Sequence, residues 1–363
     1  MPSTTAPSTT APSTTAPSTA RSTTAPSTSA PARSLPLVAG ALVLALAGCA
    51  GSTTAGEAPP EPSAAPAATA TGDFPLTLDN CGVEVTLDAP PERVVTIKSS
   101  ATEMVLALGA GDRVVGTAFP DGPAPEALAA EAETLPVLAD KVPAAEVVLE
   151  TLPDLVYAGW ESNLTAEGAG DRATLAGLGV ATYVSPSACK DPAYQPERLT
   201  FDDVFAEITE VAAMLGVPED GDALVAEQRE ALAAVARDDR GLTALWYSSG
   251  TDVPYVGAGI GAPQMLLDTV GLTNIAAGVQ DTWASFSWEQ VAQDDPDVIV
   301  LVDSAWNSAD QKRELLAGSP ATANLTAVRE ERYLVVPFPA SEAGVRNVDA
   351  AADLAEQLAA LDV

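Results

Sequence analysis

The side chains best suited to bind a ligand follow the short apolar runs that predict β-strands. In open parallel sheets, ligands sit beyond the carboxyl ends of the strands, where helix N-termini present free backbone amides. Aromatic rings at several such ends suit stacking on a flat conjugated molecule. We therefore predict a binding site that draws on both halves of the chain: Lys98, Ser99, Ser100, Trp160, Glu161, Ser185, Ser187, Trp246, Tyr247, Ser248, Trp306, Phe338 and Arg346.

Two residues of this set, Lys98 and Arg346, carry the positive charge that suits an anionic group on a ligand. Internal salt bridges are an equally good interpretation of both. Ordinary packing is likewise an alternative interpretation of the tryptophans. Ser100 followed by Glu103 predicts a capping box at the start of a helix that begins just after Lys98.

Catalysis and metal binding find no support in the sequence. The chain contains no histidine, which removes the commonest general base and the commonest metal ligand. The glycine-rich residues 257–261 lack the lysine and hydroxyl of a P-loop, so we interpret them as a loop of close backbone approach, with or without contact to a ligand. The acidic pairs at 202–203 and 294–295 are interpreted as solvated. We expect a protein that is not an enzyme and holds neither metal nor cofactor.

The elements that position these residues alternate between short β-branched runs and helical stretches, which is typical of parallel sheets with crossover helices. Apolar spacing over residues 201–237 predicts two helices, interrupted at residues 216–218, that join two α/β lobes. The predicted strands are 94–98, 114–117, 155–158 and 180–184 before these helices, and 243–247, 298–302 and 333–336 after them.

The segment before this domain predicts export. Residues 35–49 form an apolar run that ends at Cys49, too short for the ~20 residues that span a bilayer. Its Leu-Ala-Gly-Cys ending matches bacterial lipoprotein signals, whose cysteine accepts lipid. We predict a low-complexity leader plus signal peptide at 1–48, a disordered Ala/Pro/Ser/Thr tether at 49–72, and attachment to the outer face of the cell membrane through lipid on Cys49. A buried apolar helix is the alternative.

The net charge indicates which partners the protein can bind, and the cysteine content indicates whether it can form a disulfide. With 17 basic and 50 acidic residues the net charge is −33, which disfavours nucleic acid as a partner. We expect a monomer. If Cys49 carries lipid, Cys81 and Cys189 remain as an even pair in an oxidising compartment, where a disulfide is expected, with two free thiols as the alternative.

Several segments in order resemble the iron-siderophore and cobalamin binding proteins of ABC importers. They are residues 91–97, 102–116, 153–156, 271–277 and 287–291. The resemblance implies an α/β fold of two lobes with mainly parallel sheets, at 73–199 and 239–363, joined by a rigid helical connector at 200–238, with the ligand cleft between the lobes. It also implies an ABC importer permease and its ATPase as partners, with Glu146 and Glu289 docking to the permease.

Residues 98–104, 159–164, 183–190 and 337–347 resemble more narrowly a subgroup proposed to bind a deazaflavin phospholactate, a coenzyme precursor. The expected ligand is therefore an anionic, conjugated small molecule: this precursor, a ferric siderophore or a corrinoid. A lipid-anchored surface enzyme or an adhesion-like protein on the same scaffold is the alternative function.

Overall fold

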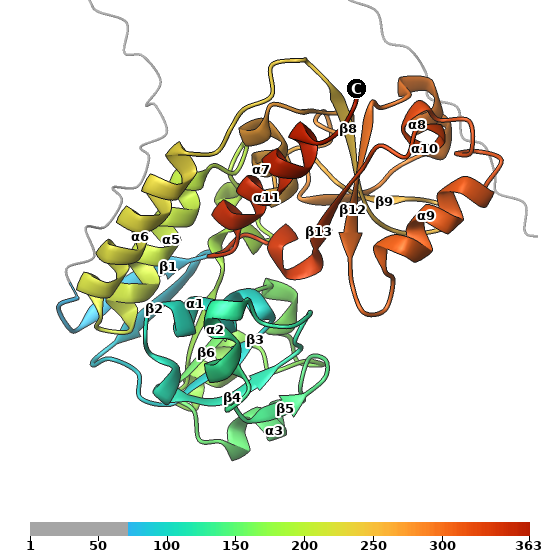
Figure 1. Cartoon of the computed structure of the whole chain (residues 1–363). Helices are drawn as coiled ribbons and strands as arrows, with labels where there is room; N and C mark the ends of the chain where they lie inside the picture. Colours follow the sequence, from blue (N-terminus) through green and yellow to red (C-terminus); the bar gives the residue numbers. More distant parts are fainter. Residues whose placement is uncertain (1–71) are drawn as a thin grey trace, which may run out of the picture. The chain divides into compact units, whose positions relative to one another are not determined.

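The computed structural model describes residues 72–363, which form two α/β lobes and two connecting helices (Figure 1). The first lobe contains a five-stranded parallel sheet in the order β5-β4-β3-β6-β7. Every residue of β3 and β6 is buried, as expected for parallel strands covered on both faces. The strands are β3 (Val94–Ile97), β4 (Val114–Ala118), β5 (Val137–Ala139), β6 (Leu155–Ala158) and β7 (Ala181–Val184).

An antiparallel hairpin of β1 (Leu76–Asn80) and β2 (Val83–Leu87) precedes this sheet. The remaining elements of the first lobe are helices that connect its strands. The α-helices are α1 (Ser99–Ala107), α2 (Glu126–Ala132), α3 (Ala145–Glu150) and α4 (Arg172–Gly177). The 3-10 helices are η1 (Gly111–Arg113), η2 (Glu161–Asn163), η3 (Pro186–Ala188) and η4 (Pro192–Tyr194).

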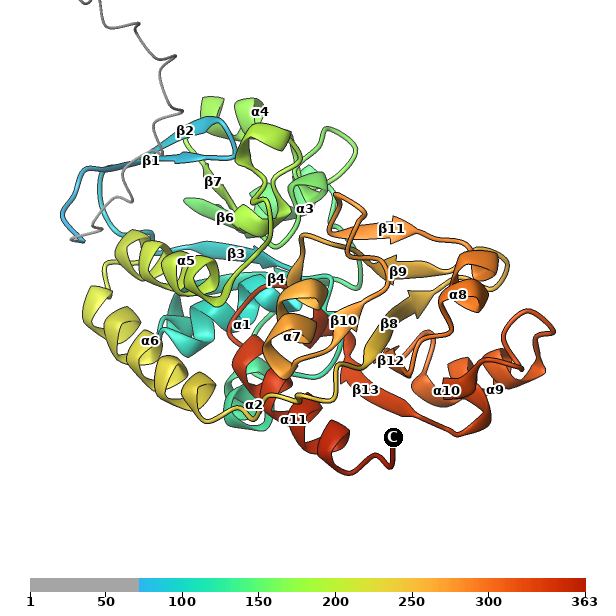
Figure 2. The same ribbon diagram turned by 90° about the horizontal axis from the view of Figure 1, so that it is seen from above.

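The connector consists of α5 (Phe201–Met214) and α6 (Pro218–Ala233), packed side by side (Figure 2). The side chain of Thr200 accepts a hydrogen bond from the amide of Asp203 and so caps α5. Gly216 has a φ of +68°, which ends the first helix, and Pro218 opens the second at a position that tolerates proline. The sequence predicted both helices and their break.

The second lobe has a mixed six-stranded sheet in the order β11-β9-β8-β12-β13, with β10 also paired to β8. Strands β8, β10, β12 and β13 are parallel, whereas β9 and β11 pair antiparallel. The strands are β8 (Thr243–Ser249), β9 (Tyr255–Gly257), β10 (Thr273–Asn274), β11 (Trp283–Ser285), β12 (Val298–Asp303) and β13 (Tyr333–Pro337). The helices are α7 (Ala262–Val270), α8 (Trp288–Asp294), α9 (Ala309–Gly318), α10 (Thr326–Arg329), η5 (Phe338–Ser341) and α11 (Asn347–Ala359).

A continuous buried apolar cluster extends from the first lobe through the connector into the second. It includes Val105 of α1, Ile208 of α5, Leu266 of α7 and Leu354 of α11, all less than 1% exposed. The lobes are therefore packed against a shared connector and not linked by a free hinge. This arrangement confirms the predicted two-lobed α/β fold, and all seven predicted strands are present.

The capping box predicted for Ser100 and Glu103 is wrong. Helix α1 begins at Ser99 without a side-chain cap, and the carboxylate of Glu103 binds Arg346 instead.

The signal segment, Cys49 and the tether up to residue 71 lie outside the described residues. Over residues 72–363, none of the helices has the length and apolar character needed to cross a bilayer.

Candidate functional site

A cavity of about 320 Å³ opens between the two lobes and is the best candidate for the ligand site. Its size lies at the lower end of the range of cavities that hold drug-sized molecules. Both lobes contribute to its wall: Trp160, Ser162, Ser187, Ala188, Cys189, Lys190 and Gln195 from the first, and Tyr255, Gly261, Ala262, Asp281, Thr282, Trp283, Ser341, Glu342 and Ala343 from the second.

The wall from the second lobe presents a stacked aromatic pair. Tyr255 of β9 and Trp283 of β11 lie on neighbouring antiparallel strands, with ring centroids 6.2 Å apart and planes at 14°. Tyr255 is 41% exposed, so the pair can extend its stack to a flat molecule in the cavity. Neither residue was among the predicted site residues, because three-residue strands leave no clear periodic signal.

The glycine-rich residues 257–261 support this wall by close backbone approach. A Cβ at Gly259 would lie 2.2 Å from the carbonyl oxygen of Ala277, so the position has no room for a side chain. Gly261 lines the cavity directly. The loop thus has the close contact expected from the sequence, and part of its backbone faces the site.

Trp160 and Glu342 meet across the cleft. The indole Nε1 of Trp160 donates a hydrogen bond to Oε2 of Glu342, which follows η5 in the second lobe. Burial raises the pKa of Glu342, while the nearby positive charge of Lys98 lowers it to a smaller extent. Both residues line the cavity, so their hydrogen bond connects the cavity wall of the first lobe to that of the second.

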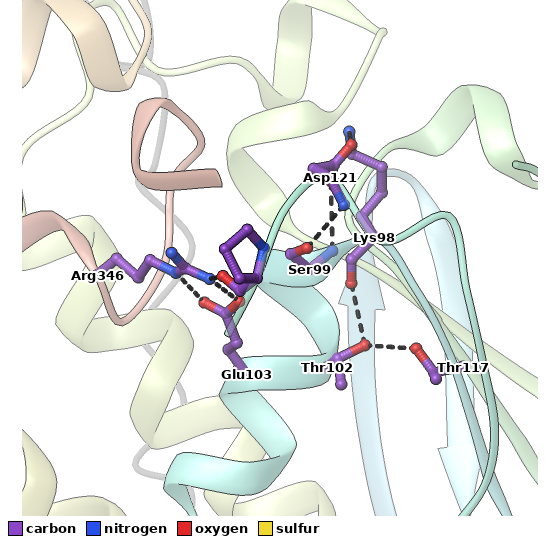
Figure 3. A network of polar contacts seen from close by, with 8 residues as sticks. Lys98, Ser99, Thr102, Glu103, Thr117, Asp121 and Arg346 are labelled. Atoms are coloured by element: carbon purple, nitrogen blue, oxygen red, sulfur yellow. Dashed lines mark hydrogen bonds and ion pairs between the residues drawn. The ribbon is translucent and has the colours of Figure 1, made fainter. Parts of the chain in front are cut away.

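Lys98 lies behind Trp160, inside a cage of aromatic rings. Its ammonium is 3.5 Å from the ring centroid of Trp160, 4.6 Å from Phe119 and 4.9 Å from Phe338. The same ammonium is 2.5 Å from Oδ1 of Asp121 (Figure 3). Lys98 is fully buried and is not part of the cavity wall. Its charge is therefore already neutralised within the protein.

Asp121 also occupies the N-terminus of α1, where the sequence predicted a ligand. The Asp121 carboxylate accepts from the amide of Ser99 at 3.3 Å, and the Ser99 hydroxyl accepts from the amide of Asp121 at 2.9 Å. Burial raises the pKa of Asp121 more than the charge of Lys98 lowers it. The positive helix terminus and the lysine thus share one internal carboxylate.

Arg346 is likewise neutralised inside the protein. Its guanidinium binds both carboxylate oxygens of Glu103 in α1 and donates to the carbonyl of Pro123 at 2.7 Å (Figure 3). Burial raises the pKa of Glu103, and Arg346 lowers it in opposition. Arg346 comes from the second lobe, whereas Glu103 and Pro123 belong to the first. The arginine is a bridge between lobes and lies outside the cavity wall.

The other predicted residues are distributed around and beyond the cavity. Ser187 lines it, and Glu161 accepts a hydrogen bond from the amide of the lining residue Lys190. Ser185 does not line the cavity, and its hydroxyl is 3.4 Å from the hydroxyl of Tyr157. A further group lies away from the cavity lining: Ser99, Ser100, Trp246, Tyr247 and Ser248 are buried, Trp306 is 58% exposed, and Phe338 packs edge-on against Trp306.

A disulfide joins Cys81 to Cys189, with sulfur atoms 2.01 Å apart. Cys81 lies at the turn of the β1–β2 hairpin, and Cys189 lines the cavity. The neighbouring Asn80 reinforces this connection, because its amide exchanges two 2.8 Å hydrogen bonds with the backbone of Val184. The hairpin therefore holds the segment of the cavity wall that follows β7.

Two lobes around a connector, with a polar and aromatic cavity between them, suit capture of a small molecule. Within residues 72–363, no group of three or more Cys, Asp and Glu side chains is arranged to hold a metal ion.

The periplasmic binding protein family matches residues 94–340. The chain belongs to this family. It is 26% identical over 294 residues to the uncharacterized ABC transporter substrate-binding lipoprotein YvrC of Bacillus subtilis, covering 78% of this chain and 86% of the relative. It is 29% identical over 269 residues to a cobalamin-binding protein of Halobacterium salinarum, covering 70% of this chain and 66% of the relative.

Solved structures of periplasmic binding proteins share the architecture. A crystal structure titled as an ABC-type Fe³⁺-hydroxamate transport system, from Saccharomonospora viridis, matches with a TM-score of 0.70 and 28% identity. The match covers 79% of this chain and all of that chain. A periplasmic binding protein from Veillonella parvula matches with the same TM-score and 27% identity, covering 79% of this chain and 98% of that one.

The two glutamates predicted to dock this binding protein to a permease occupy equivalent places in its lobes. Glu146 lies in the first turn of α3, which precedes β6, and Glu289 lies in the first turn of α8, which precedes β12. Both side chains are exposed. The hydroxyl of Ser287 donates to Glu289 at 2.6 Å and lowers the pKa of that carboxyl.

Proposed function

We propose that this chain is the substrate-binding component of an ABC importer and carries a conjugated small molecule with an anionic group to the permease. The observation that supports this most directly is the cavity between the lobes, which has aromatic and polar walls from both sides. Trp160 belongs to one wall, and the stacked pair of Tyr255 and Trp283 belongs to the other. A flat ligand in the cavity would therefore meet aromatic surface from both lobes.

Lys190 is the residue that we assign to the anionic group of the ligand. Among the residues that line the cavity it is the only lysine or arginine, and Ser162 and Ser187 of the same lobe add hydroxyl groups to the wall. The two cations predicted from sequence, Lys98 and Arg346, are each paired with a carboxylate. We therefore expect Lys190, in place of Lys98 and Arg346, to donate charge-assisted hydrogen bonds to the anionic group of the ligand.

Cavity size favours the smaller of the ligands considered. About 320 Å³ suits a tricyclic ring system such as a deazaflavin better than an enclosed corrinoid or a whole ferric siderophore. The relatives that are named for cobalamin and for Fe³⁺-hydroxamate transport support the importer role more than they support either ligand for this chain. We therefore place the deazaflavin phospholactate precursor first among the three.

Membrane attachment through lipid on Cys49 completes the proposal. The relative YvrC is named as a lipoprotein, which supports the signal predicted at residues 35–49. Cys49→Ala should leave the domain folded and release it from the membrane fraction. A Cys49→Ala protein that still sediments with membranes after a high-salt wash would contradict the lipid anchor.

The ligand proposal is tested by native mass spectrometry of protein purified from its own host, with one bound small molecule per chain as the expected result. Isothermal titration of the recovered molecule should then show weaker binding to Lys190→Ala by about ten- to a hundredfold, as expected for a lost charge-assisted bond. Lys141→Ala is the matched control, because Lys141 is exposed on the same lobe and does not line the cavity. Equal affinity of both variants for the ligand would remove Lys190 from the site.

A further inference from the structure

Glu342 has a feature that its bridge to Trp160 does not explain. Its oxygen Oε2 accepts from the indole Nε1, whereas its other oxygen, Oε1, is buried and has no hydrogen-bond partner among residues 72–363. The residue is 8% exposed and lines the cavity between the lobes. A buried carboxylate oxygen without a donor is unfavourable, because the hydrogen bonds that it made to water in the unfolded chain are not replaced in the folded protein.

Two nearby cations, Lys98 and Lys190, do not resolve this imbalance. Burial raises the pKa of Glu342 more than their charges lower it. The ammonium of Lys98 is hydrogen-bonded to Asp121, and the described residues contain no ion pair between Glu342 and either lysine. Oε1 therefore stays without a donor, and a donor group on a ligand in the cavity can supply the missing hydrogen bond.

We propose that Glu342 selects ligands whose conjugated ring carries an N–H or O–H group at its edge, and that this group donates to the second oxygen of Glu342. The inference rests on the proposed function, since it needs a flat ligand in the same cavity. Rotation about the terminal torsion of a glutamate is soft, so Oε1 can turn toward such a donor while the carboxylate keeps its contact with Trp160. Lys190, on the opposite lobe, is left to bind the anionic substituent.

The substitution Glu342→Gln separates this role from a purely structural one. An amide has one oxygen that accepts and one nitrogen that donates. The indole N–H of Trp160 requires the oxygen, so the glutamine keeps the bridge between the lobes. It then presents an NH₂ group where the second carboxylate oxygen was, and two donors face each other when a ligand with an edge N–H is bound.

Flavin mononucleotide and its N3-methyl derivative are the probes. Both have the same flat tricyclic ring and phosphate, but methylation removes the single N–H of the ring. The wild-type protein should bind flavin mononucleotide at least about tenfold more tightly than the methylated probe, as expected for one hydrogen bond to a charged group. In Glu342→Gln this preference should disappear, with the loss confined to flavin mononucleotide. Isothermal titration and quenching of flavin fluorescence measure both affinities.

Glu314→Gln is the matched control. It makes the same chemical change at an exposed side chain of α9, in the same lobe, that does not line the cavity. This variant should keep the wild-type preference for flavin mononucleotide. Loss of the preference in Glu314→Gln but not in Glu342→Gln would overturn the assignment, as would equal affinity of the wild type for the two probes.

Two remaining outcomes are also decisive. If the wild type binds neither probe, the inferred ring class is wrong, while the binding-protein role stands or falls on the molecule recovered by mass spectrometry. If Glu342→Gln weakens both probes equally, Glu342 acts only through the bridge to Trp160, and its proposed selective role is refuted.

Discussion

Arg346 and Glu103 join the two lobes through a pair of parallel hydrogen bonds between guanidinium and carboxylate. The side chain of Glu103 is 4% exposed and that of Arg346 is 13% exposed, so the pair is largely shielded from water. Arg346 immediately precedes α11, and Glu103 lies in the middle of α1. Trp160 and Glu342 form a second polar bridge between the lobes.

Removal of the arginine should be more harmful than removal of the whole pair. Arg346→Met leaves the Glu103 carboxylate buried without its partner, and we expect the free energy of unfolding to fall by about 3 kcal/mol. The double variant Arg346→Met with Glu103→Leu should recover most of that loss, because no charge is then left unpaired. Urea denaturation of Arg346→Met, of Glu103→Leu and of the double variant measures the coupling between the two residues. Strictly additive losses would show that the pair does not act as a unit.

The disulfide between Cys81 and Cys189 should stabilise both the fold and the cavity wall. Reduction or replacement by Cys81→Ser with Cys189→Ser should lower the free energy of unfolding by roughly 2 to 5 kcal/mol, as for other native disulfides. Ligand affinity should fall as well, since Cys189 lines the cavity. Thermal melting with and without dithiothreitol checks the first effect. The double serine variant serves as the control, because its melting temperature should not respond to the reductant.

Glu207 should make stability depend on pH. This residue of α5 is 4% exposed, and burial raises its pKa to about 7, although hydrogen bonds from Ser185 and Tyr157 lower it. It faces Tyr157 of β6 and Ser185, and Glu210 of the same helix adds a negative charge nearby. Glu210 is in turn hydrogen-bonded to Tyr183 of β7.

The sign follows from proton binding. Between the ordinary glutamate pKa of 4.5 and about 7, the folded protein keeps a proton on Glu207 that the unfolded chain has lost. The free energy of unfolding should therefore decrease as the pH rises through this window, by up to about 3 kcal/mol. Glu207→Gln should make the decrease smaller and be more stable than the wild type at pH 8, while other buried carboxyls with raised pKa, such as that of Glu210, keep part of the slope. Denaturation at pH 5 and pH 8 tests this, with the exposed Glu219→Gln of α6 as a control that keeps the wild-type slope.

Seven strands of the two larger sheets could be predicted because parallel strands covered on both faces are continuous apolar runs. The runs at 94–97 and 155–158 are fully buried, as that pattern requires. The three-residue strands β9 and β11 escaped prediction, since they have neither length nor alternation. They carry Tyr255 and Trp283, so the aromatic pair in the cavity was missed with them.

The rule that ligands bind at strand ends selected some residues that line the candidate cavity, and the structure places the others away from its lining. Strand β8 extends to Ser249, two residues beyond the predicted end, so Trp246 and Tyr247 lie inside the strand and are buried in the core. For Lys98 and Arg346 the sequence shows two unpaired cations. Their partners, Asp121 and Glu103, are far along the chain or on another element, and only the folded structure brings them together.

Charge reversal at the two exposed glutamates tests the predicted contact with the permease. Two lobes that shift about a stiff connector change the distance between Glu146 and Glu289, and a permease with matching arginines could sense that distance. Interaction with the helix dipole explains either residue alone, at about 0.3 to 1 kcal/mol of local stability, but does not explain their matched positions before β6 and β12.

Glu146→Arg combined with Glu289→Arg should therefore abolish uptake and leave ligand affinity and melting temperature nearly unchanged. Glu150→Arg combined with Asp294→Arg is the matched control, because these exposed acids end the same two helices and give the same change in net charge. The control pair should support uptake at close to the wild-type rate. Uptake is measured in cells in which the variant is the sole binding protein. Normal uptake by the first pair, or equal loss in both pairs, would show that docking does not depend on these two glutamates.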